Sequence, residues 1–178
     1  MPKMKLNYTI SFNNYTNNYV DIVLSISDIN ISNDKLLLCL PTWTPGSYLI
    51  REYAKNIDQV VLLEDDNKTV LQKQNKNSWI IPINNKNEIT IAYAVYCFEW
   101  GVRNNFINDE LIFLTGAATF FYVKGNENLP IEIIIEVPKN YTKIATSLKK
   151  VAGNEWHRKA DNYDELVDSP IEIGNQEN

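Results

Sequence analysis

The feature that most limits what this chain can fold into is a strict alternation of apolar and polar residues. Leu, Tyr, Ile and Phe occupy positions 6, 8, 10 and 12, and Asn7, Thr9 and Ser11 stand between them. The same period of two returns at residues 20–26, 87–98 and 129–137. Because successive side chains of a strand point to opposite faces of the sheet, each segment predicts a strand with one buried face and one wet face.

About ten such short strands are expected, separated by turn residues and without helical spacers of the length that βαβ units need. This pattern is typical of an all-β protein and predicts an antiparallel β-sandwich. Only residues 47–57 predict a helical turn, since Leu49, Tyr53 and Ile57 follow one another at a spacing of four. At most one short helical turn is therefore expected.

The charge balance excludes some classes of partner. Lys and Arg number 17 against 22 Asp and Glu, so the formal net charge is −5. A nucleic-acid partner is not expected, because neutralising phosphates takes a surplus of basic side chains. A membrane partner is not expected either, because no stretch approaches the roughly 18 apolar residues of a spanning helix. The first residues contain no apolar signal core, which favours a cytoplasmic protein or one whose leader has been removed.

Residues able to bind a metal or act as nucleophiles are scarce. The chain has one histidine, His157, and two cysteines, Cys39 and Cys97, so we expect no zinc site within it. Both cysteines lie in apolar runs, which favours small buried hydrophobes, while a Cys39–Cys97 disulfide stays open as an alternative. Acidic residues gather at positions 161–172 without the spacing of a calcium loop. There is no G-x-S-x-G and no glycine-rich phosphate loop, so no catalytic residue is expected.

Two segments differ from ordinary sandwich sequence. Residues 41–48 read Pro-Thr-Trp-Thr-Pro-Gly-Ser-Tyr, a stiff loop that presents large rings at low entropic cost. Such a loop indicates recognition or docking, and the alternative is a loop that plugs one end of the sandwich core. Residues 163–174 read Tyr-Asp-Glu-Leu-Val-Asp-Ser-Pro-Ile-Glu-Ile-Gly, in which carboxylates are interleaved with apolar residues.

Together with residues 50–57, Trp79 and Val102-Arg103, these two segments resemble the amino-terminal domain of the glycyl-aminopeptidase family of zinc metallopeptidases. The resemblance implies a β-sandwich that precedes a thermolysin-like catalytic domain and, in many members, a PDZ domain. Those members release amino-terminal Gly or Ala from peptides. The chain has no H-E-x-x-H, the motif that supplies two zinc ligands and the glutamate that activates water, so no catalytic residue is carried over. The implied zinc belongs to a catalytic domain outside these residues.

The resemblance also implies partners and an organisation. Residues 1–174 are expected to form a single domain, with 175–178 starting a linker to the catalytic domain. The partners are that catalytic domain and peptide substrates. The candidates for docking are Trp43, Pro45, Tyr48, Arg51, Asp164, Asp168 and Glu172.

In related, larger aminopeptidase families a loop of the corresponding domain approaches the amino terminus of the substrate. The segment that matches it by order is 114–119, which makes Thr115, Gly116 and Ala117 candidates for the substrate cleft. On this hypothesis, Gly116→Trp impairs peptide turnover in the complete enzyme with little loss of stability.

A second interpretation comes from another functional class. The chain would be a stand-alone β-sandwich module that binds a carbohydrate or a protein through exposed aromatic side chains, among them Trp43, Tyr48 and Trp100. A purely structural domain without a ligand is the third interpretation.

Overall fold

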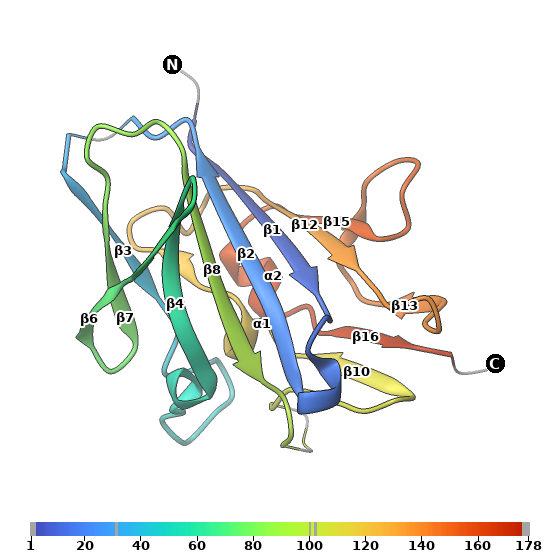
Figure 1. Cartoon of the computed structure of the whole chain (residues 1–178). Helices are drawn as coiled ribbons and strands as arrows, with labels where there is room; N and C mark the ends of the chain where they lie inside the picture. Colours follow the sequence, from blue (N-terminus) through green and yellow to red (C-terminus); the bar gives the residue numbers. More distant parts are fainter. Residues whose placement is uncertain (1–2, 31, 100, 102, 176–178) are drawn as a thin grey trace.

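The computed structural model describes residues 3–30, 32–99, 101 and 103–175. It consists of one eight-stranded sheet and two four-stranded sheets that lie on the same side of it (Figure 1). The expected all-β fold is confirmed. In spatial order the strands of the large sheet are β14 (Lys149–Lys150), β15 (His157–Ala160), β12 (Ile131–Glu136), β1 (Lys5–Ser11), β2 (Tyr19–Ser27), β8 (Ile89–Tyr96), β4 (Ile57–Glu64) and β5 (Asn67–Val70).

The two small sheets cover different halves of the large one (Figure 1). One contains β13 (Lys143–Ala145), β16 (Ile171–Gly174), β10 (Leu111–Leu114) and β9 (Phe106–Ile107). The other contains β11 (Tyr122–Val123), β3 (Lys35–Cys39), β7 (Ser78–Pro82) and β6 (Gln72–Asn75).

The alternation in the sequence becomes the inner and outer faces of the large sheet. In β1, Leu6, Tyr8 and Ile10 are buried, and they pair in register with Ile26, Leu24 and Ile22 of β2, which are buried as well. The strands β8 and β12 follow the same pattern. Each large apolar side chain removed from water contributes roughly 1.5–3 kcal/mol to folding, so this repeated burial fixes both register and face.

A single cluster of buried apolar residues draws members from all three sheets and from the short helices. The rings of Phe120 and Phe121 are fully buried in it, where Phe121 contacts Trp79 of β7 and Tyr93 of β8 edge-on. A continuous core of this extent is what a chain needs in order to fold by itself.

Three features differ from the expectations. The described residues form sixteen strands rather than about ten, several of them only two to four residues long. Strand β1 runs parallel to β12, so the large sheet is not wholly antiparallel. The structure also contains more helical turns than the one expected within residues 47–57, which is present as the 3-10 turn η2 (Tyr53–Asn56). The further turns are η1 (Tyr15–Asn17), α1 (Gly116–Thr119) and α2 (Tyr163–Val167).

The cysteines are both free and buried, so they act as small hydrophobes and the alternative disulfide does not form. Within the part of the chain that the structure describes, no helix is long and apolar enough to cross a membrane.

Candidate functional site

The loop from residue 41 to residue 52 holds large apolar side chains in water. Tyr48 is fully exposed and Trp43 is 53% exposed, with Leu49 and Ile50 exposed beside them. The loop is nevertheless fixed, because the Trp43 Nε1–H donates to the Ser47 carbonyl at 2.6 Å and the Arg51 N–H donates to the Thr42 carbonyl at 2.7 Å. The loop does not plug the sandwich core with its rings, and that alternative is wrong.

A second segment braces this loop. The guanidinium of Arg103, one of the residues that carried the resemblance, donates to Ser47 Oγ at 3.2 Å and to the Gly46 carbonyl at 3.1 Å. Gly46 has a φ of +80°, a conformation that glycine adopts at no steric cost. The hydrogen bonds of Arg51, Trp43 and Arg103 therefore hold the loop at its ends and at its tip. Trp100 and Val102 lie outside the described residues.

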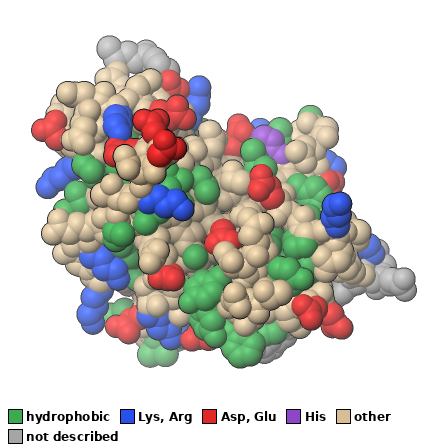
Figure 2. All heavy atoms as spheres, viewed as in Figure 1, with side chains coloured by type: hydrophobic (Ala, Val, Ile, Leu, Met, Phe, Trp, Pro, Cys, Tyr) green, Lys and Arg blue, Asp and Glu red, His purple; other side chains and the backbone are tan. Residues whose placement is uncertain are grey.

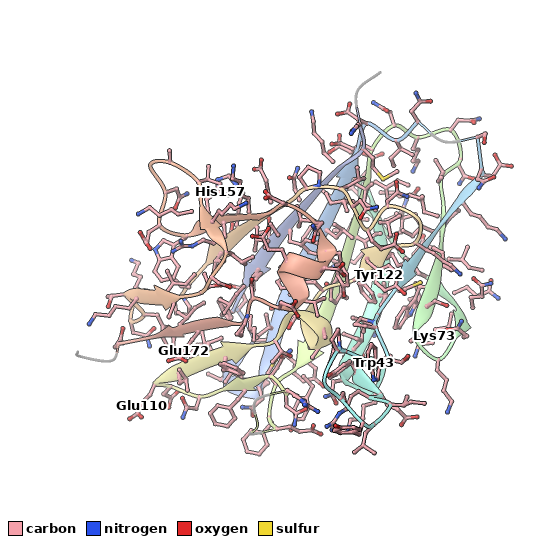
Figure 3. All side chains as sticks on the ribbon, turned by 180° about the vertical axis from the view of Figure 1, so that it is seen from behind. Trp43, Lys73, Glu110, Tyr122, His157 and Glu172 are labelled. Carbon is pink, nitrogen blue, oxygen red and sulfur yellow. The ribbon has the colours of Figure 1, made fainter. Side chains whose placement is uncertain are left out.

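The other docking candidates lie on several elements. Pro45 is exposed on the loop and Arg51 is half-buried at its end. Asp164 and Asp168 are exposed on α2 and just after it, whereas Glu172 is half-buried in β16, opposite Phe113 of β10. Figure 3 shows Trp43 and Glu172 from behind the large sheet. The role of all seven candidates in docking stays a prediction.

The substrate-cleft candidates lie in the interior. Thr115, Gly116 and Ala117 are all buried at the start of α1. The side chain of Asn105, also buried, accepts from the Thr115 N–H at 2.8 Å and donates to Thr119 Oγ1 at 2.9 Å. Asn105 thus ties both ends of α1 to the segment that follows β8.

Three buried tyrosines hold the residues that follow α1. Their hydroxyls donate to three consecutive carbonyls: Tyr93 of β8 to Thr119 at 2.8 Å, Tyr163 of α2 to Phe120 at 2.7 Å, and Tyr8 of β1 to Phe121 at 2.5 Å. Burial raises the pKa of each of these hydroxyls well above its usual value near 10. Elements distant in sequence therefore fix one short stretch of backbone.

Gly116 is required by the close approach of α1 to α2. A Cβ added at this position would lie 2.3 Å from the Leu166 carbonyl oxygen and 2.7 Å from the Val167 Cα. Both atoms belong to backbone and cannot rotate away. The expectation that Gly116→Trp costs little stability is wrong, because the substitution must push the two helices apart.

Sequence reasoning gave no role to Asn105 or to the hydroxyls of the three tyrosines, although Tyr163 begins the segment 163–174 that carries the resemblance. Asn105 is one of 24 asparagines and has no motif around it. Tyr8 and Tyr93 occupy apolar positions of alternating strands, where the pattern marks them only as core residues. No local signal distinguishes a hydroxyl that will find a partner more than 20 residues away.

The described residues do not offer a zinc site. Among them, no group of three or more His, Cys, Asp or Glu residues is close enough to hold a metal ion. The Nε2 atom of His157 in β15 lies 2.8 Å from a carboxylate oxygen of Glu132 in the neighbouring strand β12. The acidic residue Asp161 pairs with Lys149. The residues present do not fit zinc, and we derive no catalytic step from it.

The comparison with known families shows the family of the chain. The family model of the peptidase M61 N-terminal domain matches residues 7–175. The chain belongs to this family. The resemblance to the amino-terminal domain of glycyl-aminopeptidases is thereby confirmed at the level of the family.

A solved structure extends the comparison. The M61 N-terminal domain is similar to a crystal structure of the aminopeptidase N family protein from Idiomarina loihiensis, with a TM-score of 0.85 and 29% sequence identity. The match covers 96% of this chain and 29% of the other, so the chain spans less than a third of the length of that protein. No curated protein matches the chain significantly.

In this M61 N-terminal domain, α1 is the meeting point of the segments that carried the resemblance. It contacts η2, which follows the exposed loop, and α2, which contains the Tyr-Asp-Glu-Leu sequence. Loop, candidate cleft segment and carboxyl-terminal motif therefore belong to one connected region.

Proposed function

We propose that the chain is the non-catalytic amino-terminal domain of a zinc-dependent aminopeptidase that releases amino-terminal Gly or Ala from peptides. The family supports an accessory domain of a peptidase, and the similar aminopeptidase N family protein supports a longer parent protein. In this proposal the zinc ligands belong to another part of that protein.

The observation that carries the docking role is the rigid exposed loop. Trp43, Tyr48, Leu49 and Ile50 remain in water while backbone and Arg103 hydrogen bonds hold the loop in shape. Large rigid apolar side chains at a surface contribute most of the energy of protein interfaces, because little entropy is lost when they are covered. The loop therefore suits a surface that a catalytic domain covers.

The assignment of residues 115–117 to the peptide cleft stays a prediction. Because these residues are buried and Asn105 ties both ends of α1, they would act by fixing the local backbone shape rather than through side-chain contacts with a peptide. A backbone fixed in this way needs no reordering when a substrate binds.

The first test is made on the native protein, captured from its source cells with an antibody raised against these 178 residues. We expect a product much heavier than 20.6 kDa that contains about one zinc per chain and releases Gly or Ala from peptides. A metal-free product of about 20.6 kDa would contradict the proposal and favour the stand-alone binding module.

The docking role is tested by Tyr48→Asp. Because Tyr48 is fully exposed, we expect the isolated domain to lose less than about 0.5 kcal/mol in its free energy of unfolding. In the full-length protein the buried carboxylate should loosen the domain contact and increase its cleavage by limited proteolysis several-fold. Val70→Asp is the matched control, since Val70 is also exposed and apolar but lies on the edge strand β5. Equal proteolysis of both variants would argue against docking through the loop.

A further inference from the structure

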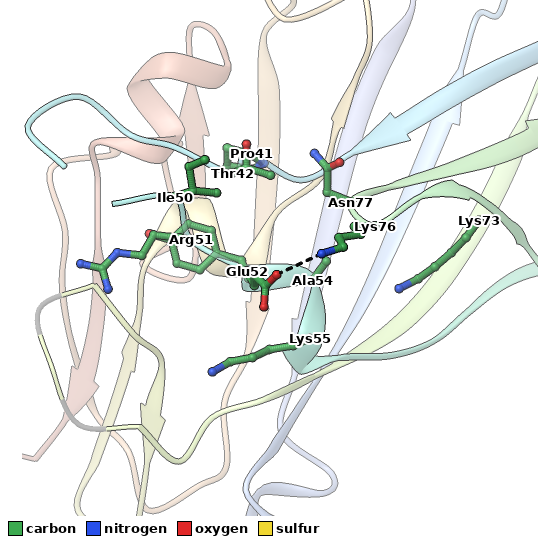
Figure 4. A pocket seen from close by; sticks show the side chains of 11 residues that line it. Pro41, Thr42, Ile50, Arg51, Glu52, Ala54, Lys55, Lys73, Lys76 and Asn77 are labelled. Carbon is green, nitrogen blue, oxygen red and sulfur yellow. Dashed lines mark ion pairs between the residues drawn. The ribbon is translucent and has the colours of Figure 1, made fainter. Parts of the chain in front are cut away.

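A pocket of about 430 Å³ opens between the end of the exposed loop, η2 and the β6–β7 hairpin (Figure 4). Its floor includes Tyr53 and Ala54, both buried, and Ile50 and Pro41 add further apolar surface. Residues 41–48 and 50–57, which stand out in the sequence, supply one side of this pocket, but no sequence signal joined them to the β6–β7 hairpin. Because of its apolar floor, the pocket can accept a ligand with an apolar part.

The pocket is basic in a protein whose net charge is negative. Lys55, Lys73 and Lys76 come to it from three places, η2, β6 and the hairpin turn, and Figure 4 shows them at separate points around the pocket. Glu52 is the one carboxylate among the lining residues. The electrostatic potential there should attract anionic groups.

The lysines are only weakly neutralised. The Lys76 ammonium lies 3.5 Å from Glu52, and both side chains are largely exposed. Lys55 pairs with Glu99 at 3.2 Å, also in water. Exposed pairs contribute about 0–1 kcal/mol, so an incoming carboxylate can compete for these ammonium groups.

Lys73 has a different partner. Its ammonium lies 4.8 Å from the centre of the Trp79 ring, and the described residues give it no carboxylate within ion-pairing distance. A cation over an aromatic ring keeps its charge and its hydrogen-bond donors. Lys73 is therefore the cation most ready to accept an anionic group.

Arg51 lines the rim without joining this set. Figure 4 shows its guanidinium turned away from the three lysines. Its Nε is buried without a hydrogen-bond partner. The anion contacts of the pocket thus come from lysine side chains.

We propose that this pocket binds an acidic peptide, with carboxylates on Lys73 and Lys76 and an apolar side chain against Tyr53 and Pro41. Ammonium groups that are spread around an apolar floor suit several carboxylates along a chain better than one compact phosphate, which is usually cradled by converging backbone N–H groups. The inference goes beyond the proposed function, since it needs neither a catalytic domain nor peptide turnover.

The experiment titrates the 178-residue chain with a fluorescent, end-capped hexapeptide, Leu-Glu-Glu-Phe-Glu-Glu, and follows anisotropy at 50 mM and 300 mM salt. The peptide with Gln in place of every Glu measures the contribution of the charges. We expect the acidic peptide to bind at least tenfold more tightly than the amide peptide at low salt, and the difference to shrink at high salt because screening weakens exposed ion pairs.

The double variant Lys73→Gln with Lys76→Gln should weaken binding of the acidic peptide about tenfold, since it removes two cations and leaves Glu52 unpaired. The matched control, Lys68→Gln with Lys124→Gln, changes the net charge equally at exposed positions outside the pocket and should leave binding within twofold. Equal binding of the two peptides, equal weakening by the two double variants, or displacement by equimolar inorganic phosphate would overturn the proposal.

Discussion

Replacing Gly116 with alanine is expected to destabilise the domain by about 3 kcal/mol or more, and replacing it with tryptophan is expected to prevent folding. The reason is the contact with α2, where a single added carbon would lie 2.3 Å from the Leu166 carbonyl oxygen. Relief requires α1 and α2 to separate. That movement would disturb the hydrogen bond from Tyr163 on α2 to the Phe120 carbonyl. Domains of this size have a total stability of about 5–15 kcal/mol, so the loss is a large fraction of it.

Urea unfolding of Gly116→Ala, followed by tryptophan fluorescence, measures this loss. Gly153→Asn is the matched control, because Gly153 has a φ of +83° and a Cβ there meets nothing within 4 Å. Asparagine tolerates this left-handed conformation, so the control should change the free energy of unfolding by about 1 kcal/mol or less. An unchanged urea midpoint for Gly116→Ala would refute the close helix contact.

Because a side chain at position 116 disturbs the packing of α1 against α2, Gly116 variants cannot test whether residues 115–117 line the substrate cleft. Loss of peptide turnover in a Gly116 variant of the full-length protein would report damaged packing rather than a lost substrate contact. Ala117→Gly removes one buried methyl group in the same turn and creates no clash, so it is a better probe of the segment. It should cost about 1 kcal/mol.

The strands could be predicted because their signal is local. In β1, β2, β8 and β12 each side chain faces the core or the solvent according to its own position in the alternation, so burial can be predicted from the sequence residue by residue. The exposure of Trp43 and Tyr48 could not be decided from the sequence, because the composition of the loop fits both docking rings in water and a plug of the core, and the structure decides for the former.

The two α-helices differ in how far the sequence alone could predict them. The start of α2 carries a recognisable signal, because the Asn162 side chain accepts from the Glu165 N–H at 2.9 Å, an Asn-x-x-Glu capping arrangement. The short α1 has no side-chain cap of its own. It depends on Asn105, on the Tyr93 contact and on the space that Gly116 leaves, and these are contacts between distant segments.

The parallel pairing of β1 with β12 is a similar case. Residues 6 and 131 are neighbours in the register, but the alternation is identical for parallel and antiparallel partners. The relative direction of β1 and β12 depends on the path of the long connection between the two strands, and the alternation of apolar and polar residues does not reveal that path.

Alkaline pH is expected to unfold the domain through Tyr8, Tyr93 and Tyr163. Burial raises the pKa of each hydroxyl in the folded state, whereas in the unfolded chain tyrosine ionises near pH 10. Below pH 10 both states hold these protons and stability does not change on their account. Above it the unfolded state releases protons that the folded state retains, so the free energy of unfolding falls by about 1.4 kcal/mol per pH unit for each tyrosine, or about 4 kcal/mol for the three.

Urea unfolding between pH 8 and pH 12 measures this slope, and absorbance at 295 nm reports tyrosinate formation. Tyr163→Phe tests its origin, because it leaves the buried Phe120 carbonyl without its donor and removes one of the three titrating groups. We expect it to cost about 1–2 kcal/mol at pH 8 and to reduce the alkaline slope by one proton. Tyr48→Phe, at a fully exposed position, should change neither quantity. If Tyr163→Phe kept the full slope, the alkaline transition would arise elsewhere, and the three hydroxyls would not be what holds residues 119–121 in place.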